Sequence, residues 1–177
     1  AEADVSIRPG WFWHAAQDAQ IKSLDKLMQI YSATVGRNAV MMLNVPPDRR
    51  GLFTDGDVKR LKEFGDRAER VFKTNLGEEA WKTTRPDANG DLIVDLKRPV
   101  SFNRVMLGED IARGQHIEAF TIDAWDGHTW KEIAAGTTIG YKRLLKMNTV
   151  RTPKVRVRTI ATRAPASITS FGLFLER

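Results

Sequence analysis

The feature that most constrains this sequence is a change of hydrophobic pattern near residue 76. Before it, apolar residues recur at three- and four-residue spacing or form short continuous runs; after it, short stretches alternate between apolar and polar residues. The first pattern is typical of helices with one buried face, and the second is typical of half-buried strands. We therefore predict two domains, residues 1–76 and residues 77–177, with residues 77–91 as the linker.

The first domain has the pattern strand, helix, strand, helix. Residues 5–7 are a short apolar run, and residues 39–45 are apolar on both faces, which favours a parallel strand covered on both sides. Residues 18–35 are predicted to form a helix that Gly36 closes at its C-terminal end. Such a series predicts an α/β sheet or barrel. Because two strands do not make a stable sheet, the domain is expected to be the end of a larger structure.

The second helix of this domain is predicted to begin after Thr54. Thr54 is an expected N-cap, and Asp57 follows three residues later, where it can meet exposed backbone N–H groups. The buried stripe of this helix is expected to comprise Val58, Leu61, Phe64, Ala68, Val71 and Phe72.

The second domain is predicted to contain only strands. Turn residues, including the pairs 89–90, 98–99, 126–127 and 152–153, separate the stretches that alternate. Short strands at this spacing predict a β-sandwich. The seven expected strands are residues 91–96, 102–107, 117–125, 130–134, 138–145, 154–161 and 168–175. The predicted fold class is thus α/β followed by all-β.

Composition excludes several classes of function. The chain has no cysteine, which excludes disulfides and thiolate metal sites, and its three histidines lack the spacing of metal ligands. Its net charge of +6 is spread along the sequence. The basic residues of the stretch 154–158 alternate, which favours a solvated strand face over a phosphate-binding patch. The longest apolar run is too short to cross a bilayer. We expect no cofactor, no nucleic acid partner and no membrane partner.

Candidate binding residues follow the two strands of the first domain, because the carboxyl ends of parallel barrel strands carry the binding groups. Residues 8–14 contain Arg8, Trp11, Trp13 and His14, and Asn44 ends the second run. Indole rings stack on the apolar faces of sugars, while arginine and histidine donate to hydroxyl groups or carboxylates. The aromatic residues, including Phe12, are equally consistent with a plug at the top of a barrel. For His14, a packed or capping role is favoured over ligand binding.

A glycosidase needs two carboxyl groups that flank the scissile bond, and this chain offers no convincing pair. Glu2 and Asp4 lie at the start of the first strand, away from its carboxyl end. Asp48, which precedes Arg49 and Arg50, is expected to form a salt bridge within its loop. We therefore assign no catalytic residue.

Five motifs resemble one enzyme family. In the first domain they are residues 2–14 (EADVSIRPGWFWH), 32–38 (SATVGRN) and 43–52 (LNVPPDRRGL), and in the second 108–120 (GEDIARGQHIEAF) and 136–143 (GTTIGYKR). They resemble the α-L-fucosidases of glycoside hydrolase family 29, particularly the subgroup that cleaves α-1,3/1,4-fucosyl branches. The resemblance covers essentially the whole chain.

The resemblance implies a fold and a reaction. Residues 1–76 are expected to be the last two strand-helix units of a (β/α)8-like barrel, and residues 77–177 its C-terminal β-sandwich. The reaction is retaining hydrolysis of fucosylated glycans, with the aspartate nucleophile and the acid/base glutamate in an upstream barrel segment. Arg8, Trp11, Trp13, His14 and Asn44 would form part of the substrate-binding wall. The resemblance also implies a periplasmic or secreted location.

Two other hypotheses concern the sandwich alone. It could be a carbohydrate-binding module, for which Trp125 and Trp130 are the candidate platform, although core anchoring is favoured for this pair. It could instead be a structural lid on the barrel. The sequence favours the lid over the binding module.

Overall fold

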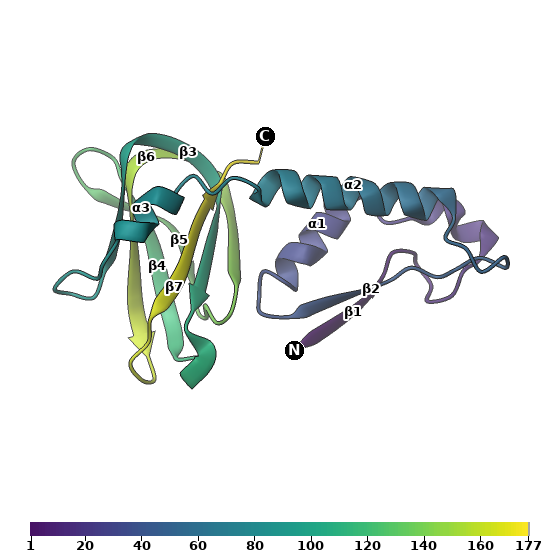
Figure 1. Ribbon diagram of the computed structural model, residues 1–177, viewed down its shortest axis with the longest axis horizontal. Coiled ribbons are helices and arrows are strands. Elements are labelled where there is room, and N and C mark those ends of the chain that lie inside the picture. The colour runs from purple at the N-terminus through teal and green to yellow at the C-terminus, as the bar shows by residue number, and fades with distance from the viewer. Residues whose placement is uncertain (177) are drawn as a thin grey trace. The chain divides into compact units, whose positions relative to one another are not determined.

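The computed structural model describes residues 1–176 and omits the side chain of Arg113. The chain divides into two compact units, Ala1–Lys73 and Thr74–Arg177, so the division lies three residues before the expected boundary. The structure is mostly β-sheet with few helices (Figure 1). Along the part of the chain that is described, no helix is long and apolar enough to span a membrane.

The first unit contains a small parallel sheet. Strand β1 (Glu2–Ser6) pairs with β2 (Val40–Asn44), and the register runs from Glu2 opposite Val40 to Ser6 opposite Asn44. The parallel pairing was predicted correctly, but the described residues cover only one face of β2 and not both, as expected. Val40 and Met42 are 61% and 51% exposed, because no described residue covers that face.

Two α-helices accompany this sheet and lie on the same side of the strands in Figure 1. They are α1 (Leu24–Ala33) and α2 (Asp55–Phe72), and a 3-10 helix, η1 (Ala15–Gln20), precedes them. The first helix therefore starts later than predicted, at the N-cap Ser23, whose side chain accepts a hydrogen bond from the Lys26 N–H. Its C-cap is Thr34, so Gly36 lies one residue beyond the expected position, but its N–H still closes the last turn by donating to the Tyr31 carbonyl over 3.1 Å.

Helix α2 begins as predicted. Thr54 is its N-cap, and its hydroxyl accepts a hydrogen bond from the Asp57 N–H. Val71 is buried, whereas Val58 is 51% exposed and does not belong to a buried stripe.

The second unit is built on one antiparallel sheet of five strands in the order β5-β4-β6-β3-β7. The strands are β3 (Leu92–Glu109), β4 (Ile117–Trp125), β5 (Trp130–Gly136), β6 (Arg143–Thr162) and β7 (Ile168–Phe174), with a 3-10 helix η2 (Ile111–Arg113) after β3. The prediction of seven strands was wrong. Strand β3 joins two of the expected strands and β6 joins two more, and both bend over at the top of the unit in Figure 1.

The expected turns at residues 98–99 and 152–153 are a bulge instead. The β3–β6 register shifts between the pair Asp95–Lys154 and the pair Val100–Thr152. At this shift Lys97 adopts a φ of 63°, and its N–H donates to Asp95 Oδ1 over 2.9 Å. A proline has no N–H to donate to the neighbouring strand, and a β-bulge accommodates it. The prolines that suggested turns in the sequence therefore lie within continuous strands.

Apolar side chains from these strands form the core of the second unit. Its members include Val94, Phe102, Leu107, Phe120, Val157 and Phe171. Gly136 lies against Phe120, and a Cβ at this glycine would come within 2.6 Å of the ring. The close approach explains a glycine inside β5, where the sequence suggested a turn.

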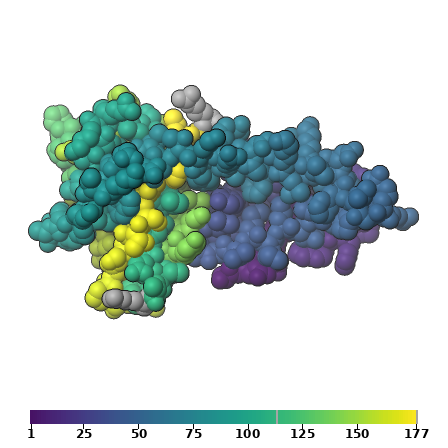
Figure 2. Space-filling view, viewed as in Figure 1, coloured from purple at the N-terminus to yellow at the C-terminus, as the bar shows by residue number. Residues whose placement is uncertain are grey.

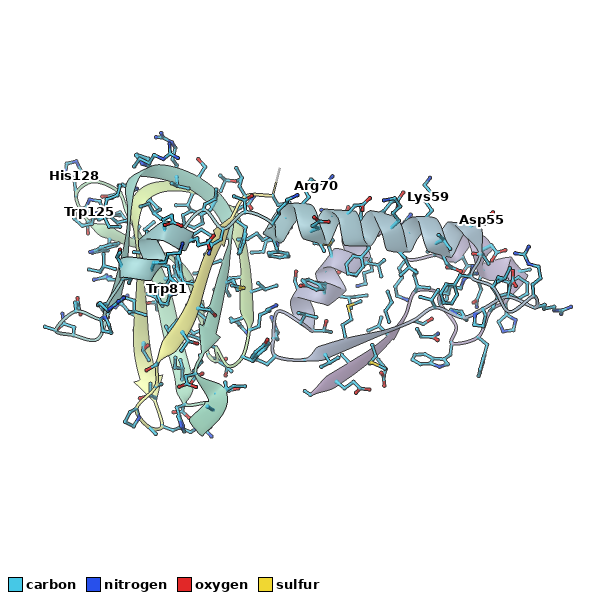
Figure 3. All side chains as sticks on the ribbon, viewed as in Figure 1. Asp55, Lys59, Arg70, Trp81, Trp125 and His128 are labelled. Atoms are coloured by element: carbon cyan, nitrogen blue, oxygen red, sulfur yellow. The ribbon has the colours of Figure 1, made fainter. Side chains whose placement is uncertain are left out.

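The segment expected to be a linker belongs to the second unit. It contains α3 (Glu78–Thr83), which carries Trp81 (Figure 3). The Trp81 ring stacks on Phe171 of β7 with ring centroids 5.6 Å apart. Asn75 Nδ2 donates to the Phe171 carbonyl over 2.9 Å, and Asn75 Oδ1 accepts from the Leu173 N–H. In the space-filling view β7, in yellow, crosses the visible face of this unit (Figure 2). These contacts explain why the division falls before Thr74.

Candidate functional site

The two loops that follow β1 and β2 meet at the carboxyl ends of the strands. The Ile7 N–H donates to the Asn44 carbonyl over 2.9 Å, and Asn44 Nδ2 donates to the Trp11 carbonyl over 2.8 Å. Ser6 Oγ donates to the Gly10 carbonyl over 2.7 Å and also accepts from Asn44 Nδ2. Asn44 therefore ties the second strand to the loop that carries the candidate aromatic residues.

Arg8 lies beneath this loop and is completely buried. Its Nε and Nη2 donate to the Asp57 carboxylate, with a shortest distance of 2.7 Å, and Nη1 donates to Asp18 Oδ1 over 2.7 Å. Nη2 also donates to Thr54 Oγ1 over 2.9 Å. One guanidinium thus joins the loop after β1 to η1 and to the first turn of α2.

Burial and charge act in opposite directions on Arg8. Burial lowers the pKa of its guanidinium, but the hydrogen bonds and charges of Asp57 and Asp18 together raise that pKa above its ordinary value. Asp57 is itself completely buried, so each charge depends on the other. This geometry gives Arg8 a positioning role. Its direct contact with substrate stays a prediction.

The aromatic residues of the loop are positioned rather than buried. Trp13 Nε1 donates to Asp18 Oδ1 over 3.1 Å, so the carboxylate that pairs with Arg8 also orients this indole. Trp11 is 50% exposed and Phe12 is 76% exposed, so within the described residues neither is a buried plug. Their binding to a sugar stays a prediction.

A pocket of about 630 Å³ opens between the two loops. Its lining residues are Phe12, Trp13, His14, Ala15, Pro46, Pro47, Asp48 and Arg49. Trp13 and His14 of the predicted site residues thus line it, while Arg8, Trp11 and Asn44 lie outside the lining. The side chain of His14 is exposed, so the packed role was wrong. His14 is nevertheless the N-cap residue of η1, and its carbonyl accepts a hydrogen bond from the Gln17 N–H over 2.9 Å, although its side chain makes no capping hydrogen bond.

Asp48 forms the predicted loop salt bridge. Arg50 Nη2 lies 2.7 Å from Asp48 Oδ2, and Arg50 Nε lies 2.9 Å from the same oxygen. The hydrogen bond from the Arg50 side chain holds the pKa of Asp48 below its usual range, and backbone N–H groups of Arg50 and Leu52 add to this effect. This pairing does not favour Asp48 as a catalytic acid.

Arg49 is a charged residue of the pocket lining that the sequence-based prediction did not assign to the site. Its signal in the sequence was its place in the loop after β2, two residues after Pro47. In the described part of the chain no group of three or more acidic, histidine or cysteine side chains is arranged to hold a metal ion.

The tryptophans of the second unit do not form an open platform. Trp125 and Trp130 meet edge to face with ring centroids 5.2 Å apart, and the Arg156 guanidinium lies 4.7 Å from the Trp130 ring centre. Both are half-buried and lie outside the core, so core anchoring was also wrong. Arg156 and Arg158 both donate to buried Asp123, over 2.9 and 2.8 Å.

Comparison with known proteins gives consistent similarity over both units. Residues 2–70 match the alpha-L-fucosidase family model. Alpha-L-fucosidase 1 of Arabidopsis thaliana is 33% identical over 100% of this chain and 41% of its own length. A Bacteroides ovatus protein of known crystal structure is 44% identical, with a TM-score of 0.91 over 98% of this chain and 30% of that chain.

A further solved structure contains the sugar. The glycoside hydrolase family 29 fucosidase of Ruminococcus gnavus, in complex with fucose, is 27% identical, with a TM-score of 0.85 over 99% of this chain and 41% of that chain. The present chain spans about two fifths of the length of the curated relatives it matches. These similarities in sequence and structure show that the chain belongs to the alpha-L-fucosidase family, glycoside hydrolase family 29.

Proposed function

We propose that this chain is the C-terminal portion of an exo-acting, retaining α-L-fucosidase that removes α-1,3/1,4-linked fucose from glycans. The observation that carries the proposal is the pocket at the carboxyl ends of two parallel strands, with Trp13 oriented by Asp18 and with His14 exposed beside it. An indole of fixed orientation suits the apolar face of a sugar, and a histidine suits its hydroxyl groups.

The proposed architecture is the last two strand-helix units of a (β/α)8-like barrel followed by a β-sandwich. The exposed side chains of Val40 and Met42 support the barrel, because they form an apolar face on a sheet of only two strands. Neighbouring strands of an upstream barrel segment would cover that face and pair with the open edges. The bent strands β3 and β6 and the apolar core support the sandwich.

The proposed division of labour follows from the residues present. The nucleophile and the acid/base would belong to the upstream segment, since Asp48 is held by Arg50 and none of the other described lining residues of the pocket is a carboxylate. In a retaining reaction the nucleophile forms a glycosyl-enzyme, which water then hydrolyses. The residues of this chain would bind and orient the sugar. The proposal needs no cofactor, and it includes a periplasmic or secreted location.

For the second unit we propose a structural role as a lid rather than carbohydrate binding. The Arg156 guanidinium covers one face of Trp130, which leaves little open indole surface for a sugar. Replacement of both Trp125 and Trp130 by alanine should leave retention on an immobilised fucosylated glycan unchanged. Loss of retention with an intact fold would restore the binding-module hypothesis.

The experiment that tests the function combines native mass spectrometry with a chromogenic α-L-fucoside assay. The 20.0 kDa chain alone is expected to be inactive, and its complex with an upstream barrel segment is expected to hydrolyse the fucoside. In the active complex, Trp13→Ala should lower kcat/KM at least tenfold, whereas the matched change Trp125→Ala should not. A folded complete protein without fucosidase activity would overturn the proposal.

A further inference from the structure

Two adjacent arginines in the loop after β2 have opposite environments. The loop is a tight turn in which the Gly51 N–H donates to the Asp48 carbonyl over 2.9 Å and the Asp48 N–H donates to the Leu52 carbonyl over 2.8 Å. Gly51 has a φ of 78°, a left-handed conformation that favours glycine. The turn is therefore closed by its own backbone, and the positions of Arg49 and Arg50 in it are well defined.

Within the turn, Arg50 forms an ion pair with Asp48, whereas Arg49 does not. Arg50 folds back onto Asp48, whose side chain is 8% exposed, so this pair contributes little net charge to its surroundings. Arg49 is exposed and makes no hydrogen bond or ion pair with any residue that the structure describes. A cation without an internal partner, held on a closed turn, is available to a ligand.

Among the described residues, Asp48 is the one acidic residue in the lining of the pocket that includes Arg49, and Arg50 already occupies its carboxylate. Asp18 lies outside this lining and accepts from Arg8 and from Trp13. The pocket thus presents aromatic surface from Phe12 and Trp13 together with one available positive charge.

We propose that Arg49 is a specificity-determining residue that makes this pocket prefer glycans carrying an anionic group, either a sulfate ester or a carboxylate. The aromatic wall contacts the sugar ring, and the guanidinium pairs with the anion, for which its planar donors are well suited. As a statement about substrate class, the inference rests on the proposed function. As a statement about binding, it can be tested without turnover.

The direct test measures ligand binding to the 177-residue chain by NMR titration. The probes are lactose, 3′-sulfolactose and 3′-sialyllactose, which share the disaccharide and differ in the anion. Both anionic probes are expected to bind about three- to fivefold tighter than lactose, as for a solvent-exposed charge pair, and the preference should shrink as salt is added. The two anionic arms show whether the sulfate or the carboxylate is the better ligand.

Three variants test whether the preference for anionic probes depends on Arg49. Arg49→Gln should abolish the preference and Arg49→Lys should retain part of it, while both keep the fold because Arg49 has no described partner to lose. Lys59→Gln is the matched control, since Lys59 projects from α2 into solvent and its removal changes the net charge equally (Figure 3). Equal binding of all probes, a preference that survives Arg49→Gln, or an equal loss with Lys59→Gln would overturn the inference.

Kinetics on the complete protein separate this inference from the proposed function. The ratio of kcat/KM values for a sulfated and a neutral fucosylated trisaccharide should fall about three- to fivefold in Arg49→Gln. If neutral fucosides are cleaved but the ratio does not change, the inference fails and the function stands. If no fucoside is cleaved but the anionic probes still bind through Arg49, the function fails and the inference stands.

Discussion

The two units of this chain fill their interiors with different chemistry. In the first unit the largest completely buried side chain is Arg8, accompanied by Ile7 and Leu27. In the second unit the largest completely buried side chains are apolar and include Phe102, Phe120 and Leu107, although Asp123, which pairs with two arginines at the edge of this interior, is equally buried. The largest buried group of the first interior is therefore a paired charge, whereas most of the second interior is apolar surface removed from water.

The two interiors are therefore expected to lose stability in different ways when one side chain is replaced. A buried ion pair contributes little net stability compared with an apolar replacement, but removal of one partner leaves an uncompensated charge. An apolar core loses stability in proportion to what is removed. The first unit also leaves Val40 and Met42 exposed, whereas the core of the second unit is closed. The charge network therefore keeps the candidate site in position within a weakly covered unit.

The largest effect is expected from Arg8→Met. The change leaves the buried Asp57 carboxylate without its cationic partner and should lower the free energy of unfolding of the first unit by about 4 kcal/mol. Urea titration followed by the NMR signal of the Trp13 indole measures it. The double variant Arg8→Met/Asp57→Leu should recover at least half of the loss. A decrease of less than about 1 kcal/mol would show that the Arg8–Asp57 pair is not needed for the stability of the first unit.

Leu107→Ala is expected to lower the free energy of unfolding of the second unit, by a smaller amount than Arg8→Met lowers that of the first. Removal of this completely buried side chain should cost about 3 kcal/mol, seen in the indole signals of Trp81 and Trp125 during urea unfolding. The control Ile160→Ala, at a position 54% exposed in β6, should cost less than about 0.5 kcal/mol. The Trp13 signal should not move with either variant. If Leu107→Ala also lowered the stability of the first unit, the two interiors would not be independent of each other.

The two helix N-caps of the first unit give a finer test. Thr54→Ala should cost about 1.5 kcal/mol, because the Thr54 hydroxyl accepts from Arg8 and from the Asp57 N–H and donates to the Asp57 carboxylate over 2.8 Å. Ser23→Ala, which removes only the bond to the Lys26 N–H, should cost about 0.5 kcal/mol. Thr54→Ser should restore most of the loss. Equal costs for the two caps would mean that the bonds to Arg8 and to the Asp57 carboxylate add nothing.

The smallest effect concerns the turn that contains Arg49. The folded-state pKa of Asp48 lies below its ordinary value, so the turn is fully stabilised above the unfolded pKa of about 3.9 and loses this stabilisation as pH falls through the lower folded value. Hydrogen exchange of the Gly51 amide should therefore show less protection below about pH 4, after correction for intrinsic exchange. Asp48→Asn should remove this pH dependence. Its persistence in that variant would assign it to another group.

Much of the local structure was predictable from the sequence. The bounds of β4, the N-cap at Thr54, the turn at residues 126–127 and the Asp48–Arg50 pair all agree with prediction. The cap, the turn and the ion pair each join groups only a few residues apart, so local conformation and short-range hydrogen bonds decide them, while the bounds of β4 follow its alternating pattern and the turn after it. The parallel pairing of β1 with β2 followed from two apolar runs with a helical segment between them.

Other parts needed contacts between distant residues. The fusion of expected strands into β3 and β6 depends on a bulge that only their pairing creates. The same proline signals are compatible with a turn or a bulge, and the partner strand decides between them. The helix α3 was missed because its stabilising contact, Trp81 on Phe171, joins opposite ends of the second unit.

In the candidate site, too, some features follow from the local sequence and others from contacts between distant residues. The location of the site could be predicted from the sequence alone, because the loops after two parallel strands must meet at their carboxyl ends and these loops contain the aromatic residues. The role of each residue there depends on the folded structure. Arg8 is buried because Asp57, 49 positions away, is brought to it by α2, while Arg49 is available because Arg50 takes the single carboxylate of the turn. Residue type sets which interactions are possible, but burial and the competition for partners, which exist only in the folded chain, select among them.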